Sequence, residues 1–219
     1  MPIIFALLLS GLFWTLTYLL IIARGFQDKT YGMPFVALCA NISWEFIFAF
    51  VLPQTRPQVF VNYVWFALDC VILFQFLKYW RSDPPLNLRD AKWFYLIFVV
   101  TLAASFLAVL LLSLDLQDKE GKYAAYGQNL LMSVLFVTMF LRRGNLAGQS
   151  FYIALFKLLG TLIPSIAFFL LRPNAWLFDF LYVTIFIFDF TYLILVYRMT
   201  RELGLNPWTD LLRRAKHAT

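Results

Sequence analysis

The chain has 219 residues, of which 62% are hydrophobic and 20% aromatic, and its mean hydropathy is +0.76. This composition leaves too little polar surface to cover a soluble globule, so it excludes the soluble classes and places the chain in a bilayer. The formal charge of +6 comes from basic residues that flank the apolar runs instead of forming one basic face, which argues against a nucleic-acid partner.

Seven apolar runs are long enough to cross a hydrocarbon core about 30 Å thick. In chain order they cover residues 2–24, 33–52, 61–80, 91–112, 123–141, 151–170 and 175–198. The segments between them contain prolines and glycines, and none is long enough to hold a further domain. We therefore predict an all-α integral membrane fold, a bundle of seven transmembrane helices. It forms one domain over residues 1–219, with a short basic cytoplasmic tail from about residue 199.

The second run contains the stretch "NISWEFIFAF" at residues 41–50, in which Asn41 and Glu45 interrupt an apolar sequence. An ionisable side chain at the centre of a membrane helix costs at least about 2.5 kcal/mol. The spacing of four residues puts both side chains on one helix face, where Asn41 can form a hydrogen bond with Glu45. A carboxyl group in hydrocarbon keeps its proton, because desolvation disfavours the anion. The pattern predicts that Glu45 is an oriented proton donor.

Two further acids lie in the third and seventh runs. Asp69 follows two aromatic residues, and Asp189 shares one helical stripe with Tyr182 and Tyr192. At about 1.5 Å per residue, Glu45 and both aspartates fall near the middle third of the membrane. A single buried acid is often a structural hydrogen-bonding device, and Asp69 fits that interpretation equally well. Three acids at similar depth favour a functional role for Glu45 and Asp189.

The sixth run contains Lys157, the one base that lies away from the ends of an apolar run. Its long side chain is expected to extend to the cytoplasmic interface instead of pairing with an acid.

Aromatic residues within the runs form a second pattern, and several are close to the acids in sequence. They are Trp14, Tyr18, Trp44, Trp65, Tyr182 and Tyr192. An aromatic face attracts a cation by about 0.5 to 2 kcal/mol. An apolar pocket with protonated acids and aromatic walls suits carbocation chemistry, and it suits a lipid-like ligand equally well.

Basic residues are divided unequally between the two sides of the predicted bundle. The side of the N-terminus has Arg56, Lys119, Lys122 and Arg172. The other side has Arg24, Lys29, Lys78, Arg81, Arg89, Lys92, Arg142, Arg143, Arg198, Arg201, Arg213, Arg214 and Lys216. The positive-inside rule then predicts an N-terminus outside or in the lumen and a cytoplasmic C-terminus. The basic stretch "RRAK" at 213–216 is expected to meet anionic lipid headgroups.

Several metal-dependent and histidine-dependent chemistries lack their motifs. Ionisation of an allylic diphosphate needs paired aspartate motifs that hold Mg²⁺, and the acids here are single and far apart in sequence. The lone histidine, His217, is in the tail, which excludes histidine-ligated zinc and histidine triads from the membrane interior. We predict acid-initiated chemistry without metal or cofactor, or proton-coupled transport.

Two segments carry a resemblance to a known family. The stretches "KTYGMPFVALCANISWEF" at 29–46 and "FDFTYLILVY" at 188–197 resemble the integral-membrane terpene cyclases of meroterpenoid and indole-terpenoid biosynthesis. The likeness extends over nearly the whole chain in length, helix number and motif order. In that family a glutamate within an Asn-x-x-Trp-Glu pattern and an aspartate of the last helix are regarded as essential. These match Glu45, with Asn41 and Trp44 beside it, and Asp189.

The resemblance implies that a carboxylic acid protonates a terminal epoxide or alkene of a prenylated substrate and that cation-olefin cyclisation follows. We expect Glu45 to be the general acid and Asp189 to deliver protons or stabilise the cation in a shared cavity, although the two roles could be exchanged. The residues expected to bind substrate are Asn41, Trp44, Asp69, Trp14, Tyr18, Trp65, Tyr182 and Tyr192.

The expected partners are a prenylated hydrophobic small molecule and membrane lipid, and no oligomeric state follows from the sequence. The alternative is a small seven-helix proton-coupled transporter or lipid-binding membrane protein. In that case Glu45 and Asp189 would form a proton relay.

Overall fold

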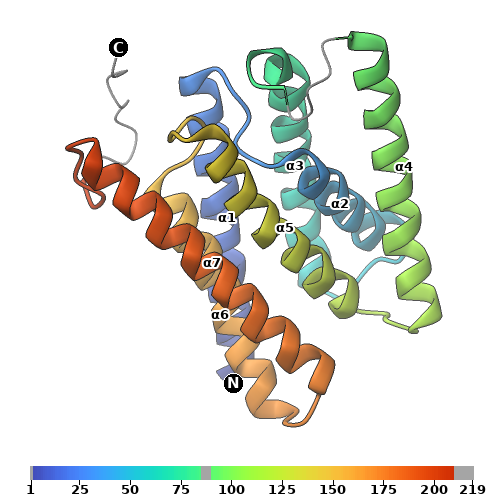
Figure 1. Cartoon of the computed structure of the whole chain (residues 1–219). Coiled ribbons are helices and arrows are strands. Elements are labelled where there is room, and N and C mark those ends of the chain that lie inside the picture. Colours follow the sequence, from blue (N-terminus) through green and yellow to red (C-terminus); the bar gives the residue numbers. More distant parts are fainter. Residues whose placement is uncertain (1, 85–89, 210–219) are drawn as a thin grey trace.

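The computed structural model describes residues 2–84 and 90–209, and every regular element in that part of the chain is a helix. Seven α-helices follow one another, with short helical stretches η1 and η2 after the second and third (Figure 1). Their bounds are α1 Pro2–Asp28, α2 Phe35–Phe46, η1 Ile47–Val51, α3 Gln58–Tyr79, η2 Trp80–Ser82, α4 Ala91–Asp115, α5 Lys122–Arg143, α6 Phe151–Leu171 and α7 Trp176–Glu202. The predicted all-α membrane fold is confirmed.

Six of the seven helices are long and apolar enough to cross a membrane, whereas α2 with η1 covers only Phe35–Val51. Prolines fix both ends of this shorter helix. Pro34 is the N-cap of α2, and Leu52 after η1 has left the helical conformation. The residue before a proline disfavours the helical region, and Leu52 precedes Pro53. The second predicted span is therefore a shorter helix between two prolines.

The short helix α2 is also strongly enclosed. It packs against α3, α4 and α5 (Figure 1), and ten of its twelve residues are buried. Helix α4 lies at the outside, where residues such as Val99, Val100 and Leu107 are exposed, as expected for a surface that faces lipid. The polar side chains of α2 must therefore find their partners inside the bundle.

On the other side of α5, helix α1 packs against α6, and α7 packs against α5 and α6. The contact between α1 and α6 depends on a small residue, as is common between membrane helices. A Cβ atom at Gly160 would lie 2.9 Å from Cδ1 of Trp14, and the Ser10 hydroxyl donates a hydrogen bond to the Gly160 carbonyl at 2.6 Å. Gly160 thus allows Trp14 to lie directly against the backbone of α6.

An ionic cluster joins the loops at the end of the molecule that is uppermost in Figure 1. Asp83 accepts hydrogen bonds from Arg142 at 2.8 Å and from Arg143 at 2.5 Å, and Arg142 also donates to the Tyr31 hydroxyl at 3.1 Å. Partial burial acts to raise the pKa of Asp83, but the hydrogen bonds and charges of the two arginines outweigh it and lower that pKa. We call these four residues the Asp83 cluster.

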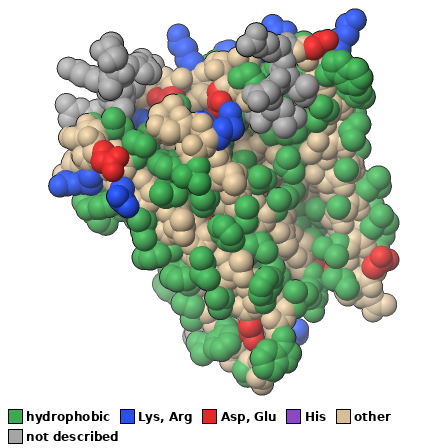
Figure 2. All heavy atoms as spheres, viewed as in Figure 1, with side chains coloured by type: hydrophobic (Ala, Val, Ile, Leu, Met, Phe, Trp, Pro, Cys, Tyr) green, Lys and Arg blue, Asp and Glu red, His purple; other side chains and the backbone are tan. Residues whose placement is uncertain are grey.

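Lys and Arg side chains gather towards the same end, at the top of Figure 2. Arg56, Lys119, Lys122 and Arg172 are in segments at the opposite end. Four basic residues used in the topology prediction lie outside the described residues. They are Arg89 and, in or beside the "RRAK" stretch, Arg213, Arg214 and Lys216. The charge asymmetry is that of a protein whose Asp83 end faces the cytoplasm, and the orientation stays a prediction.

The basic tail predicted from about residue 199 begins later, because α7 continues to Glu202. Gly204 has a φ of 69°, and its N–H donates to the Arg201 carbonyl at 3.0 Å. A glycine in the left-handed region just after a helix is a common way to end it. Residues 210–219, which include His217, lie outside the described part of the chain.

Candidate active site

Four polar side chains from three helices meet in the interior, and we call them the Glu45 cluster. Tyr18 of α1 donates a hydrogen bond from its hydroxyl to Oε1 of Glu45 at 2.6 Å. The Asn41 amide nitrogen lies 3.1 Å from the same oxygen, 2.5 Å from the Tyr18 hydroxyl and 2.7 Å from Oδ2 of Asp69 on α3. The predicted contact between Asn41 and Glu45 is confirmed, and Asp69 joins it from a different helix.

The Glu45 cluster has more acceptors than donors. Asn41 has two amide hydrogens for three neighbouring oxygens, so at most two of its three contacts are donated at once. Oε2 of Glu45 and Oδ1 of Asp69 are buried and have no hydrogen-bond donor among the residues described. No lysine or arginine forms an ion pair with either acid in that part of the chain. A proton on a carboxyl group is the donor that such a site lacks.

Glu45 lies on the wall of a cavity of about 720 Å³, which is within the usual size range of small-molecule sites. Six residues predicted from the sequence line this cavity: Trp14, Tyr18, Asn41, Trp44, Glu45 and Trp65. The rest of the wall is mainly apolar, with leucines and isoleucines from the first half of α1. We call this space the main cavity.

Hydrogen bonds hold two of its aromatic walls in place. The indole N–H of Trp44 donates to the Gly121 carbonyl at 3.0 Å, and that of Trp65 donates to the Thr15 hydroxyl at 3.0 Å. Trp14 meets the ring of Tyr18 edge to face, with 6.0 Å between centroids. Because each ring has a polar or aromatic anchor, the walls present fixed π surfaces to whatever occupies the cavity.

Sequence reasoning missed the polar residues that line the cavity near the loops opposite the Asp83 cluster. They are Gln54, Thr55, Arg56, Gln58, Glu120 and Lys122. Lys122 pairs with Glu120 at 2.5 Å, and Arg56 lies 5.4 Å from the ring centroid of Phe60. Arg56 and Lys122 entered the sequence analysis only as topology signals, because nothing local distinguishes a loop residue that lines a cavity from one that faces solvent.

The seventh-helix acid has a different environment. Asp189 accepts a hydrogen bond from the ammonium group of Lys157 on α6 at 2.5 Å, and both side chains are buried. The same ammonium group donates to Ser133 at 2.7 Å and to Asn129 at 3.4 Å, and it faces the rings of Trp14 and Phe136. The expectation that Lys157 extends to the interface is wrong. The Lys157 side chain is 0% exposed and pairs with an acid on α7, a neighbour that residue spacing on α6 could not reveal.

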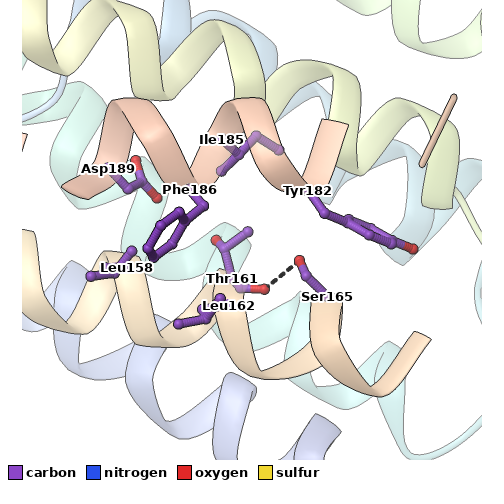
Figure 3. A pocket seen from close by; sticks show the side chains of 8 residues that line it. All are labelled: Leu158, Thr161, Leu162, Ser165, Tyr182, Ile185, Phe186 and Asp189. Carbon is purple, nitrogen blue, oxygen red and sulfur yellow. Dashed lines mark hydrogen bonds between the residues drawn. The ribbon is translucent and has the colours of Figure 1, made fainter. Parts of the chain in front are cut away.

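Asp189 does not line the main cavity. It lines a separate space of about 10 Å³ between α6 and α7, together with Thr161, Ser165 and Tyr182 (Figure 3). The expected cavity shared by Glu45 and Asp189 is therefore corrected, since the acid beside Glu45 is Asp69. Asp69 itself lies behind Asn41 and does not line the main cavity, and neither do Tyr182 and Tyr192.

Tyr192 packs against Phe136 and Phe140 in the core. Its hydroxyl has no hydrogen-bond partner among the residues described. Within residues 2–84 and 90–209, no three histidine, cysteine or acidic side chains are grouped so that they could hold a metal ion together.

Comparison with known proteins places these features in context. Residues 3–201 match the family of Pyr4-like transmembrane terpene cyclases. The Pyr4-family terpene cyclase mfmH of Annulohypoxylon moriforme is 32% identical over 83% of this chain and 77% of its own length. The terpene cyclase subB of Metarhizium robertsii is 32% identical over 67% of this chain and 86% of its own length. The terpene cyclase pyr4 of Aspergillus fumigatus is 27% identical over 90% and 86%. No solved structure matches.

Proposed function

The chain belongs to the Pyr4-like transmembrane terpene cyclases, and we propose that it cyclises a prenylated meroterpenoid or indole-terpenoid substrate by acid initiation within the main cavity. The observation that carries this proposal is the position of Glu45. Its carboxyl group is buried on a cavity wall beside three tryptophans, and one of its oxygens has no partner in the described structure. A hydrophobic prenyl substrate in a lipid environment fits the family and the apolar wall.

Glu45 is the initiating acid in this proposal. An anion at Glu45 would be costly, because the group is desolvated and lies in the same hydrogen-bonded cluster as the carboxyl group of Asp69. Tyr18 and Asn41 hold Oε1. Oε2 is buried without a partner in the described structure, and in this proposal it carries the proton that is given to a terminal epoxide or alkene. Protonation opens the epoxide, or converts the alkene to a tertiary cation, and general acids typically contribute about 10² to 10⁴ in rate.

The walls of the main cavity guide the following steps. Each double bond of the folded chain attacks the cation before it, so the positive charge moves along the substrate past Trp14, Trp44 and Trp65. Indole faces stabilise such charge by about 0.5 to 2 kcal/mol each, and an enclosed shape holds the chain in a reactive fold. Loss of a proton ends the cascade, and the product is an isomer of the substrate.

The polar loop residues of the cavity give the substrate a direction. Arg56, Lys122 and the side-chain amides of Gln54 and Gln58 suit an oxygen-rich head group, while the Glu45 cluster lies among apolar and aromatic side chains deeper in the bundle. A substrate with its head group near these loops would extend its terminal isoprene unit towards Glu45. By the charge asymmetry, the loops face the lumen or the outside, and reporter fusions at the two termini test that orientation.

The function is tested by incubating the purified protein in detergent with a panel of prenylated phenols, prenylated indoles and their terminal epoxides. Cyclisation gives a product of unchanged mass and altered retention time, and the product is expected without any ion gradient. A proton-coupled transporter or lipid-binding protein would bind members of the panel and convert none of them. Absence of conversion across the whole panel, with the protein folded, contradicts the proposal.

A further inference from the structure

We infer that Gly11 is a specificity-determining residue, and that the prenyl chain of the substrate lies along the face of α1 that is centred on it. The inference rests on the proposed cyclase function and specifies which part of the main cavity limits the length of the prenyl chain. Gly11 lies in the first half of α1, in an apolar stretch.

The first argument is that close packing does not account for Gly11. Glycines in membrane helices commonly let another element approach, and two glycines of this bundle do so. An added Cβ atom would lie 2.9 Å from Trp14 at Gly160 and 2.6 Å from Gln75 at Gly25. At Gly11, apart from its own helix backbone and adjacent residues, no atom of the described chain lies within 4 Å of an added Cβ atom. The place of a side chain is empty there.

This empty place belongs to the main cavity. Gly11 lines the cavity, and so do the four residues that are three or four positions away from it on α1. They are Leu7, Leu8, Trp14 and Thr15. Residues at that spacing share one face of a helix. Gly11 is therefore at the centre of the cavity-lining face of α1, which we call the Gly11 face.

The Gly11 face is apolar and open. On its other side α1 packs against α6, where Phe13 meets Phe156 with 5.5 Å between ring centroids. On the cavity side Leu8 and Leu12 are 61% and 53% exposed. Side chains beside an empty space lack the van der Waals contacts that a packed neighbour provides. An isoprenoid chain is a branched hydrocarbon, and it would supply those contacts.

The position of Gly11 relative to the acid favours the substrate over a membrane lipid as the occupant. Tyr18 follows Gly11 by two helical turns, about 10 Å along the axis, and its hydroxyl donates to Glu45 at 2.6 Å. Helix α1 begins at the end of the bundle where the polar loop residues of the cavity lie (Figure 1). A chain that extends from those loops to Glu45 therefore passes Gly11.

The missing side chain then gives room to the prenyl chain. In an apolar pocket, one methylene group more or less changes kcat/KM by about 10- to 200-fold. A leucine in place of Gly11 would fill part of the cavity and leave the Glu45 cluster unchanged. Longer prenyl chains should lose most, because a longer folded chain fills more of the cavity.

The test compares prenyl chains of different length. Phenols that carry geranyl, farnesyl or geranylgeranyl chains, and their terminal epoxides, are offered to the purified protein. Gly11→Leu is expected to lower kcat/KM for the longest converted chain, relative to the shortest, by about tenfold or more. Gly11→Ala should change the ratio in the same direction by less. The kcat for the shortest chain should stay within about threefold of the parent, since the acid is unaltered.

Gly127→Leu is the matched control. Gly127 lies inside α5, and a Cβ atom added there would also have no neighbour within 4 Å, but Gly127 is exposed and does not line the main cavity. This variant should keep the chain-length preference of the parent. Both leucine variants should unfold at or above the parent temperature, because leucine is a better helix former than glycine.

A second measurement needs no turnover. Gly11→Cys introduces a thiol on the Gly11 face, in a Cys70→Ser background because Cys70 is exposed. N-ethylmaleimide should modify this thiol, and a farnesylated phenol at about ten times its Kd should slow the modification about tenfold. A phospholipid at the same concentration should not slow it. The thiol of Gly127→Cys should react equally fast with and without the phenol.

Four results would overturn the inference while the cyclase function stands. The first two are an unchanged chain-length preference in the folded Gly11→Leu protein and an equal loss of kcat/KM at every chain length. The third is a thiol at position 11 whose modification the farnesylated phenol does not slow. The fourth is equal slowing by the phospholipid, since the space would then hold lipid. If the parent converts no substrate, the proposed function has failed, and protection of the thiol by the phenol alone would still support the Gly11 face as a binding surface.

Discussion

Two buried acids in this bundle have the same chemistry and opposite surroundings. Glu45 has a second carboxyl group and no cation in its cluster, and it lines a cavity of about 720 Å³. Asp189 has the ammonium group of Lys157 at 2.5 Å and lines a space of about 10 Å³. Burial is equal in the two places, with about 1% exposure each. The two acids therefore differ in the charge of their partners and in access to the main cavity, and they do not differ in burial.

Replacing Glu45 by Gln is expected to affect turnover most strongly. The substitution keeps the size and the hydrogen-bonding capacity of the side chain. An amide cannot protonate an epoxide or alkene, so we expect turnover to fall by about 10² to 10⁴. The melting temperature should stay near that of the parent, because the cluster has no counter-charge to lose. Product formed per folded protein, with thermal unfolding as the check on folding, measures both effects. A rate within about threefold of the parent would make Glu45 structural.

The second prediction concerns stability at the Asp189 site. Lys157→Met leaves Asp189 without its cation, and breaking a buried ion pair in this way costs about 3 to 5 kcal/mol. The matched change in the other cluster, Asp69→Asn, should cost much less, because no ion pair is broken. Thermal unfolding of both variants in the same detergent makes the comparison. Equal losses of stability would show that the two sites do not differ in charge as described.

The third prediction concerns the aromatic walls of the main cavity, which Glu45 lines and Asp189 does not. Replacing Trp14, Trp44 or Trp65 by Leu removes a surface worth about 0.5 to 2 kcal/mol to a passing cation. We expect turnover to fall by roughly 2- to 30-fold and prematurely quenched products to accumulate. Trp93→Leu is the control, since Trp93 is 58% exposed on α4. Chromatography of the products detects the change, and an unaltered spectrum in all three variants would place the substrate elsewhere.

The smallest expected effect extends the comparison to an acid at the aqueous end, Asp83. The pKa of Asp83 is lowered by two arginines, so the cluster stabilises the fold above the usual aspartate pKa of about 3.9. That contribution fades as the pH falls below this value and is lost once the pH is below the lowered pKa. The melting temperatures of the parent and of Asp83→Asn should therefore differ at pH 6 and become equal once the pH is below the lowered pKa of Asp83. A constant difference would contradict the assignment.

Some features of this protein follow from the sequence because their causes are local. Run length and hydropathy predict helices that cross a bilayer. The second run, predicted as a full span over 33–52, is instead a shorter helix between Pro34 and Pro53. The contact between Asn41 and Glu45 follows from a spacing of four residues on one helix. Trp44 was predicted near Glu45 for the same reason, because it precedes Glu45 on the same helix. Trp14 and Trp65 are on α1 and α3, and they were predicted from their positions inside apolar runs.

Other features were decided only by how the helices pack. Asp69 joins Glu45, and Lys157 joins Asp189, because particular faces of α2 and α3 and of α6 and α7 are turned towards each other. Sequence spacing fixes the direction of a side chain relative to its own helix and leaves open which neighbour it meets. The polar loop residues of the main cavity were undetectable for a similar reason, since a cavity exists only between elements that are distant in sequence. Residue type and spacing along each helix therefore identified the buried acids. The packing of the helices determined the partner of each acid and whether it lines the main cavity.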